Sequence, residues 1–198
     1  MKNISLAIIG SRGIPAKYGG FETFAEELAT RLVKKGYKIT VSCEYSPNKI
    51  KEYKGVKLCY FPYPPPKSYF LRKLYEILVD IYFIYKLSKN HDTIYLLGGG
   101  AGAFLFIAKI FNRKTKVLIN IDGVEWKRAK FNFLEKGLLK LNIILGSLFA
   151  DIIVLDAQAM KNYIAKSFHK KTVYIPYGIE DKKDINSVSY THLTLPTN

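Results

Sequence analysis

Short apolar runs, each long enough for one buried strand, recur along the chain and alternate with helical patterns. The runs are rich in Ile, Val and Leu, which favour strands. Strands that alternate with helices predict an α/β fold with a Rossmann-like, doubly wound parallel sheet. The predicted strands cover residues 4–9, 38–43, 56–61, 93–97, 116–121, 152–155 and 172–175.

The segment after the first run predicts an amphipathic helix. Its glutamates lie near its start and its basic residues near its end, as the helix dipole favours, and Gly36 ends it. One apolar stripe at helical spacing is formed by Phe21, Phe24, Ala25, Leu28, Leu32 and Val33.

A second helix is expected over residues 68–89, and it is apolar on most sides. We expect one stripe to face the sheet and a second, tyrosine-rich stripe to face outward, with basic residues at both helix ends. Such a helix either is covered by other helices or lies at a bilayer interface, which suits aromatic and basic residues. The inward stripe is Phe70, Leu74, Ile77, Leu78, Ile81 and Ile84, and the outward stripe is Tyr75, Val79, Tyr82 and Tyr85.

No transmembrane helix is predicted. Residues 93–108 are uncharged, but a glycine-rich block at 98–102 divides them, and charged residues interrupt residues 138–155. A membrane span needs about 20 apolar residues. Since the chain also opens directly with a short strand, we expect a cytoplasmic protein that is peripheral on the inner face of the cytoplasmic membrane, or free of it.

The charge of the chain indicates which classes of partner it binds, and its cysteines indicate its redox compartment. Lys and Arg outnumber Asp and Glu by 31 to 16, a formal net charge of +15. This excess favours anionic partners such as acidic lipid, phosphorylated substrates or nucleic acid. Cys43 and Cys59 lie in predicted strands without metal-ligand spacing, so we expect no metal and a reducing compartment. No cofactor is expected.

The segment from Gly10 to Thr23 carries the strongest motif, GSRGIPAKYGGFET. A strand, a glycine-rich loop and a helix start in this order indicate a site for a phosphorylated or polyhydroxylated ligand. The alternative is a first turn that uses glycine only for packing. The glycines are too widely spaced for a dinucleotide fingerprint, and Phe21 follows Gly20 where a P-loop needs lysine.

Four further loops are expected at the same sheet edge, because the carboxyl ends of parallel strands meet there. The loop at 122–128 concentrates Asp122, Glu125, Lys127 and the single tryptophan of the chain. Carboxylates at strand ends orient hydroxyls or accept protons. The alternative is a salt-bridged loop with a buried tryptophan. The other loops cover residues 98–102, 156–158 and 176–178.

Three segments resemble the amino-terminal domain of bacterial rhamnosyltransferase-like glycosyltransferases, in the fourth glycosyltransferase family. They are the glycine-rich motif with the Glu-Glu-Leu that follows it, Asn-Ile-Asp-Gly-Val-Glu-Trp-Lys-Arg-Ala-Lys, and Ile-Pro-Tyr-Gly. The resemblance covers residues 4–178 and implies the amino-terminal half of a GT-B fold. It implies a retaining enzyme that moves a hexose, with rhamnose as the first candidate, from a nucleotide sugar to a polysaccharide or lipid-linked precursor.

The resemblance also suggests roles for individual residues. Gly19 and Gly20 match the loop that approaches the donor phosphates, and Asp122 stands where many relatives have a histidine that contacts the transferred sugar. Asp122 is therefore the catalytic candidate, although it departs from the family pattern. Substrate binding is assigned to two groups of residues. The glycine-rich segment contributes Arg12, Gly13, Gly19, Gly20 and Glu22, and the loop at 122–128 contributes Glu125 and Lys127.

The same resemblance shapes our expectations for the domains. Residues 1–178 are expected to form the acceptor-side domain, residues 179–186 to begin an interdomain linker, and residues 187–198, which lack Lys, Arg, Asp and Glu, to be a non-native tail. The family's donor domain has no counterpart here, so this chain alone is expected to be inactive. The rivals are a sugar-phosphate or nucleotide-binding domain without catalysis, and a nucleic-acid-binding domain. No helix has the pattern of a recognition helix, which argues against nucleic acid.

Overall fold

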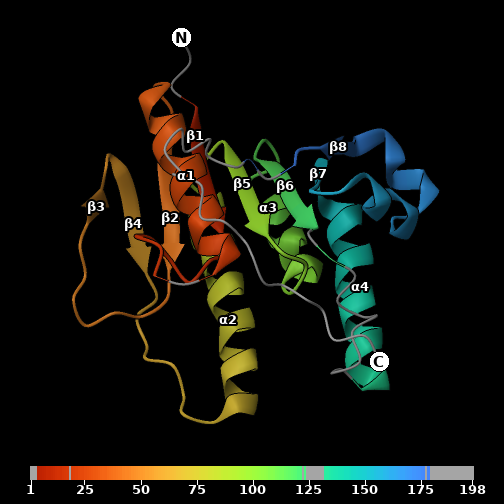
Figure 1. The fold of residues 1–198 in the computed structure, drawn as a ribbon, viewed down its shortest axis with the longest axis horizontal. Coiled ribbons are helices and arrows are strands. Elements are labelled where there is room, and N and C mark those ends of the chain that lie inside the picture. Colours follow the sequence, from red (N-terminus) through yellow and green to blue (C-terminus); the bar gives the residue numbers. More distant parts are fainter. Residues whose placement is uncertain (1–3, 18, 122, 124–131, 177, 179–198) are drawn as a thin grey trace, which may run out of the picture.

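The computed structural model describes residues 4–17, 19–121, 123, 132–176 and 178, and they form one sheet with helices on both faces (Figure 1). The strand order is β3-β4-β2-β1-β5-β6-β7-β8, and all neighbours are parallel except β3 and β4. The strands are β1 (Ser5–Ile9), β2 (Lys38–Cys43), β3 (Glu52–Tyr53), β4 (Val56–Tyr60), β5 (Thr93–Leu97), β6 (Lys116–Ile121), β7 (Ile152–Leu155) and β8 (Thr172–Tyr174).

The predicted α/β class with a doubly wound parallel sheet is confirmed. Every predicted strand is present, with its ends within one residue of the expected positions. The short antiparallel strand β3 was not predicted, because two residues carry no periodic pattern.

The helices divide between the two faces of the sheet. The helix α1 (Gly20–Lys34) packs on one face, and α2 (Tyr69–Ser88), α3 (Phe106–Phe111) and α4 (Phe133–Phe149) pack on the other (Figure 1). Three 3₁₀ segments complete the described elements: η1 (Gly102–Leu105), η3 (Gln158–Tyr163) and η4 (Lys166–Lys171).

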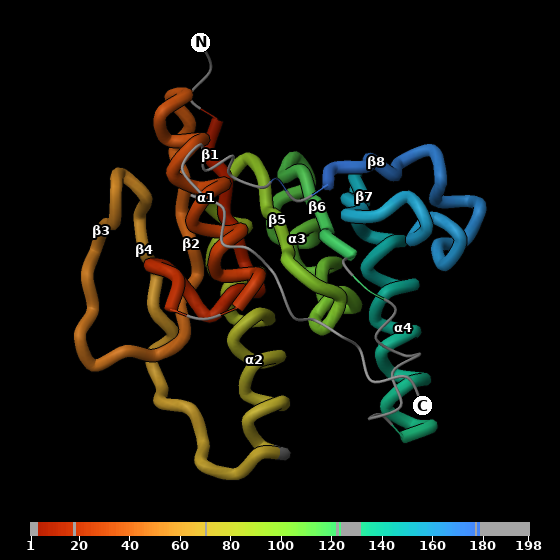
Figure 2. Tube along the Cα trace, in the orientation of Figure 1, coloured from red at the N-terminus to blue at the C-terminus, as the bar shows by residue number. Residues whose placement is uncertain are grey.

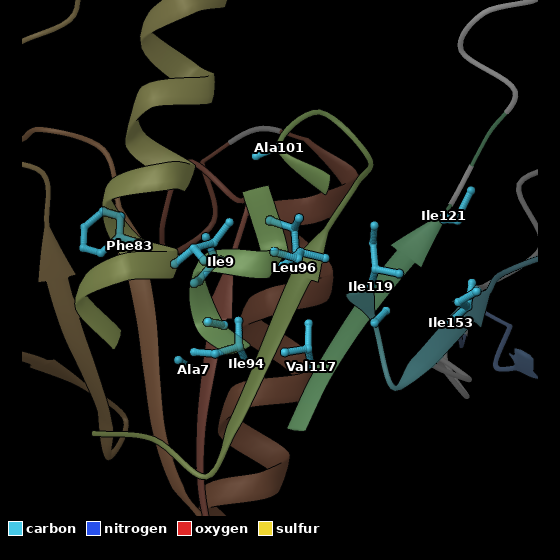
Figure 3. Close-up of a cluster of buried hydrophobic side chains, with 14 of the residues drawn as sticks. Ala7, Ile9, Phe83, Ile94, Leu96, Ala101, Val117, Ile119, Ile121 and Ile153 are labelled. Atoms are coloured by element: carbon cyan, nitrogen blue, oxygen red, sulfur yellow. The ribbon is translucent and has the colours of Figure 1, made fainter. Parts of the chain in front are cut away.

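Each central strand contributes to two hydrophobic cores, one on each face. In β1, Ala7 and Ile9 face α2, while Ile8 belongs to the core beneath α1. Figure 3 shows the first of these cores, where Leu96 of β5 lies beside Ile119 of β6 and Ile94 lies beside Val117. Because both faces are buried, the strands are continuous apolar runs rather than alternating ones.

The helix α4 approaches the sheet closely because glycines meet at the contact. A Cβ on Gly146 would lie 2.7 Å from Cδ1 of Ile119 and 3.0 Å from Cα of Gly102. At the other end, a capping box starts the helix: Asn132 Oδ1 accepts from the Glu135 N–H, and Glu135 accepts from the Asn132 N–H. The cap therefore sets where α4 begins, and the glycines set how closely it packs.

The orientation of α2 differs from the predicted one in its first half, whereas Ile84 is buried and Tyr85 exposed as predicted. Tyr75 and Val79 of the stripe expected outside are buried, whereas Leu74 and Leu78 of the stripe expected inside are each 49% exposed. The ring of Tyr75 packs edge-on against Phe61 with centroids 5.4 Å apart, and its hydroxyl donates to the carbonyl of Tyr63 at 2.9 Å. Since that hydrogen bond satisfies the hydroxyl, the tyrosine can be buried at little cost.

No helix in the described ranges is long and apolar enough to cross a membrane. The ends of α2 agree closely with the segment expected from the sequence, residues 68–89.

Asp80 lies on the inner side of α2 and is an unusual group for such a position. Burial, together with the neighbouring carboxylates Glu76 and Glu44, raises its pKa to about 8. At neutral pH the carboxyl group is therefore protonated in the folded chain and ionised in the unfolded chain.

This difference makes stability depend on pH. Because the folded state binds the proton more tightly, the free energy of unfolding falls as pH rises from the ordinary value of 3.8 to about 8. We expect Asp80→Asn to unfold at higher urea concentration than the wild type near pH 8, with a gain of at least about 1 kcal/mol, and to match it near pH 4. If the difference in unfolding free energy between the variant and the wild type were the same at both pH values, this account would be contradicted.

Candidate functional site

The candidate site lies where the direction of the strand order reverses. The chain passes from β1 outward to β2 and β4, then returns through α2 to β5 on the other side of β1. In open parallel sheets, ligands bind outside the carboxyl ends of the strands at such a switch point. The loops after β1 and β5 flank it, and a Cβ on Gly10 would lie 2.3 Å from the carbonyl oxygen of Leu97.

The remaining predicted loops leave from the same edge. β5, β6, β7 and β8 are all parallel to β1, so the segments that follow Ile121, Leu155 and Tyr174 open on this side. Asp122 directly follows the last residue of β6, but Asp122, Glu125 and Lys127 lie outside the described residues. Their assigned roles stay predictions.

The glycines of the first loop have two different environments. Gly13 has a φ of +120°, and a Cβ there would lie 2.7 Å from Cys43 Sγ; a Cβ on Gly19, with a φ of +115°, would lie 2.0 Å from Glu22 Oε2. These positions need glycine for packing and backbone shape. Apart from its chain neighbours and the backbone of its own helix, no atom of the described residues lies within 4 Å of the place where a Cβ on Gly20 would be. Packing therefore explains Gly13 and Gly19 but not Gly20.

The glycine block after β5 repeats this division. Gly98 packs under the ring of Phe21, and a Cβ on Gly99 would lie 2.6 Å from Ile143 Cγ1. Gly100 has open space around it in the described part of the chain. Each of the two loops at the switch point thus has one glycine that leaves the backbone accessible.

Two glutamates on successive turns of α1 hold the first loop in place. Glu22 Oε1 accepts from the backbone N–H of Arg12 at 3.3 Å, and Glu26 Oε2 accepts from the backbone N–H of Ala16 at 2.7 Å. Glu26 also accepts from the Tyr53 hydroxyl at 2.8 Å and from Lys54. Burial opposes ionisation, but these hydrogen bonds prevail and lower the pKa of Glu26.

The structure gives Glu22 a structural contact, and its predicted role in substrate binding stays a prediction. Sequence reasoning treated Glu26 only as an acid near the helix start. Its spacing of four residues from Glu22 was the available signal, because it places both side chains on the face of α1 beside the loop.

A cluster of charged residues surrounds Arg12 at the edge of the site. The Arg12 guanidinium lies 3.3 Å from Glu76 and 3.9 Å from Glu44, and Arg72 pairs with the same two carboxylates. Burial raises the pKa of Glu44, although both arginines act in the opposite direction. The Arg12 side chain remains 61% exposed, so its outer face is accessible to a ligand.

Two buried oxygen atoms at this edge have no hydrogen-bond partner among the described residues. They are Ser11 Oγ, two positions after β1, and Asp156 Oδ1, directly after β7. A buried polar group without a partner is costly. The loop after β7, predicted to belong to the edge, therefore carries polar groups suited to a hydroxylated ligand.

The described residues offer little for nucleophilic or metal chemistry. They contain no group of three or more His, Cys, Asp and Glu side chains placed to hold a metal ion. Burial raises the pKa of Cys43 to about 11, which keeps its thiol protonated. The arrangement suits binding of a polar ligand by backbone N–H groups, hydroxyls and a guanidinium.

Solved structures with the same fold are glycosyltransferases of the GT-B class. Sucrose-phosphate synthase from Thermosynechococcus elongatus aligns with a TM-score of 0.56 at 13% identity, over 89% of this chain and 90% of that one. LpCGTa in complex with UDP aligns with a TM-score of 0.60 at 12% identity, over 89% of this chain and 53% of that one. The catalytic domain of starch synthase IV from Arabidopsis thaliana, bound to ADP and acarbose, aligns with a TM-score of 0.59 at 12% identity. That alignment covers 89% of this chain and 52% of the other.

At these identities the alignments establish the fold, and the chain spans about half the length of two of the three neighbours. Among curated proteins, an uncharacterized 42.6 kDa protein in the cps region of Klebsiella pneumoniae is 30% identical over 100 residues. That match covers 46% of this chain and 26% of the relative.

A family profile matches nearly the whole described part of the chain. It extends over residues 2–180, from before β1 to beyond β8. The chain therefore belongs to the family described as a domain of unknown function, DUF1972.

Proposed function

We propose that this chain is the acceptor-side domain of a retaining glycosyltransferase. The enzyme moves a hexose, with rhamnose as the first candidate, from a nucleotide sugar to a polysaccharide or lipid-linked precursor. The observation that carries the proposal is the pair of glycine-rich loops at the switch point, in a fold shared with UDP-bound and ADP-bound proteins. The similarity to a cps-region protein supports the polysaccharide acceptor.

Each part of the edge has a role in this proposal. The open backbone at Gly20, at the positive end of α1, faces the phosphates of the donor. Asp122, at the end of β6, contacts the transferred sugar, and Glu125 and Lys127 orient the acceptor. Arg12 contributes its exposed guanidinium. Glu22 acts mainly by holding the loop in which Arg12 and Gly13 lie.

The alternative is a domain that binds a sugar phosphate or nucleotide without catalysis. The open helix start at Gly20 favours it as well, because that feature serves any phosphate. The two proposals differ in what they say of a saccharide acceptor, since only the first requires one.

Transfer from labelled nucleotide sugars provides the direct test. A two-domain protein that contains this chain is incubated with UDP- and dTDP-hexoses and lipid-linked or free oligosaccharides, and the anomeric configuration of the product is determined. We expect transfer with retention, and none by the 198-residue chain alone. Nucleotide binding without transfer to any acceptor would favour the alternative, and inversion would contradict the retaining mechanism.

A matched pair of glycine variants tests the role of the first loop. Gly13→Ala introduces a methyl group at a positive φ against Cys43, so we expect it to cost at least about 1 kcal/mol of stability. Gly20→Ala places its methyl group in open space, and the melting temperature should stay within error. If Gly20 approaches the donor phosphates, Gly20→Ala should nonetheless raise the KM for the nucleotide sugar several-fold. An unchanged KM would assign the loop to packing alone.

A matched pair of aspartate variants tests the catalytic candidate. In the two-domain protein, Asp122→Asn keeps the shape of the side chain and removes its charge, so we expect turnover to fall at least about tenfold with the melting temperature nearly unchanged. Asp151 lies at the opposite edge and accepts from Lys109 and from the backbone N–H of Val117. Asp151→Asn should therefore lower the melting temperature instead. Full activity with reduced stability in Asp122→Asn would make Asp122 a structural residue.

A further inference from the structure

Large apolar side chains are exposed together on the outer side of α2, α3 and α4. On α2 they recur at helical spacing at Leu71, Leu74 and Leu78, followed by Tyr85. On α4 the stripe is more exposed, with Leu134 at 74% and Leu138 at 61%. We call this surface the apolar face; it consists of Leu71, Leu74, Leu78, Tyr85, Phe106, Ile110, Phe111, Leu134, Leu138, Leu141 and Leu148.

The apolar face is continuous across the three helices. Tyr85 of α2 contacts Phe111 of α3 with ring centroids 4.9 Å apart, and Phe106 of α3 contacts Phe149 of α4 at 5.7 Å. Near their starts, α2 and α4 are joined by the ion pair of Lys73 and Glu135 at 3.4 Å. Soluble proteins rarely leave so large an apolar area exposed unless a partner covers it.

Basic residues border this surface, and the nearby acidic residues are already paired. Lys89 Nζ lies 3.8 Å from the ring centroid of Tyr85 and 5.0 Å from that of Phe111. Exposed Lys86, Arg113, Lys114 and Lys140 lie on or beside the same three helices. Glu76 is paired with Arg12 and Arg72, Glu135 with Lys73, and Asp151 with Lys109. The border of the apolar face is therefore cationic.

One end of the apolar face, formed by the first turns of α2 and α4, lies at the same end of the molecule as the candidate site. Figure 1 shows the first turns of α2 and α4 projecting beyond the carboxyl edge of the sheet. Figure 2 shows the loop after β1 (red) crossing that edge beside the start of α1. A surface that held the apolar face at this end would bring the candidate site close to itself.

We propose that the apolar face docks the domain on an anionic phospholipid bilayer. Apolar side chains with tyrosines and bordering lysines match the boundary between acyl chains and headgroups. A second copy of the chain is a poorer match, because a twofold contact would bring two cationic borders together. This inference deepens the proposed function, since a lipid-linked acceptor would be reached at the membrane, but its test does not depend on sugar transfer.

Vesicle flotation of the purified 198-residue chain tests the proposal. The vesicles are phosphatidylcholine alone, or phosphatidylcholine with phosphatidylglycerol, at salt from about 0.05 to 0.5 M. We expect recovery with the anionic vesicles only, decreasing as salt rises. Leu74→Gln with Leu78→Gln should reduce the partition coefficient about tenfold or more. Lys86→Gln and Lys89→Gln should each reduce it about fivefold.

The matched control is Ile50→Gln. Ile50 is 44% exposed, similar to Leu74, but lies between β2 and β3, away from the three helices. The Ile50→Gln variant should bind vesicles as the wild type does. Thermal melting followed by circular dichroism should show that all variants are folded.

Three results would overturn the proposal. They are equal recovery with neutral and anionic vesicles, unchanged binding of the double leucine variant, or sedimentation showing a dimer that this variant dissociates while vesicle binding is unaffected. The last result would assign the apolar face to a second copy. The measurement is separate from transfer, so loss of membrane binding in an active two-domain enzyme would leave the proposed function intact.

Discussion

The site depends on the attachment of the first loop to α1. Glu22 and Glu26 lie one helical turn apart, and each accepts a hydrogen bond from a backbone N–H of the loop. A loop of ten residues with several positive φ angles has high conformational entropy, which two charge-assisted hydrogen bonds help to offset. Because Arg12 lies in this loop, the position of its guanidinium depends on the same two carboxylates.

Parallel pairing transmits that local order to the rest of the edge. β1 pairs with β2 on one side and with β5 on the other, so the first loop lies between the ends of both. Gly10 and Gly13 permit close contact with Leu97 and Cys43, the last residues of these strands. The backbone around the switch point is thus fixed by packing on both sides, while Gly20 and Gly100 remain accessible.

The sequence predicts the sheet well because each central strand is buried on both faces. Such strands form short Ile- and Val-rich runs with clear ends, as in residues 116–121 and 152–155. The two-residue strand β3 has no such signal. The inward side of the first half of α2 could not be predicted either, because apolar residues surround the helix and the choice depends on tertiary contacts. The Tyr75 hydroxyl, for example, donates to the carbonyl of Tyr63 inside the domain. The spacing of Glu26 from Glu22 indicates the face of α1 on which it lies, but its loop-holding role also depends on where the loop returns, which is a tertiary feature.

The burial of Asp80 also alters the electrostatic character of the whole domain. The formal net charge of +15 counts every carboxyl group as ionised. With a pKa of about 8, Asp80 is mostly neutral at pH 7, so the folded domain is close to one unit more positive than its composition indicates. The unfolded chain does not share this difference, and on a cation exchanger the folded form should be retained more strongly, relative to the unfolded form, than the sequence alone implies.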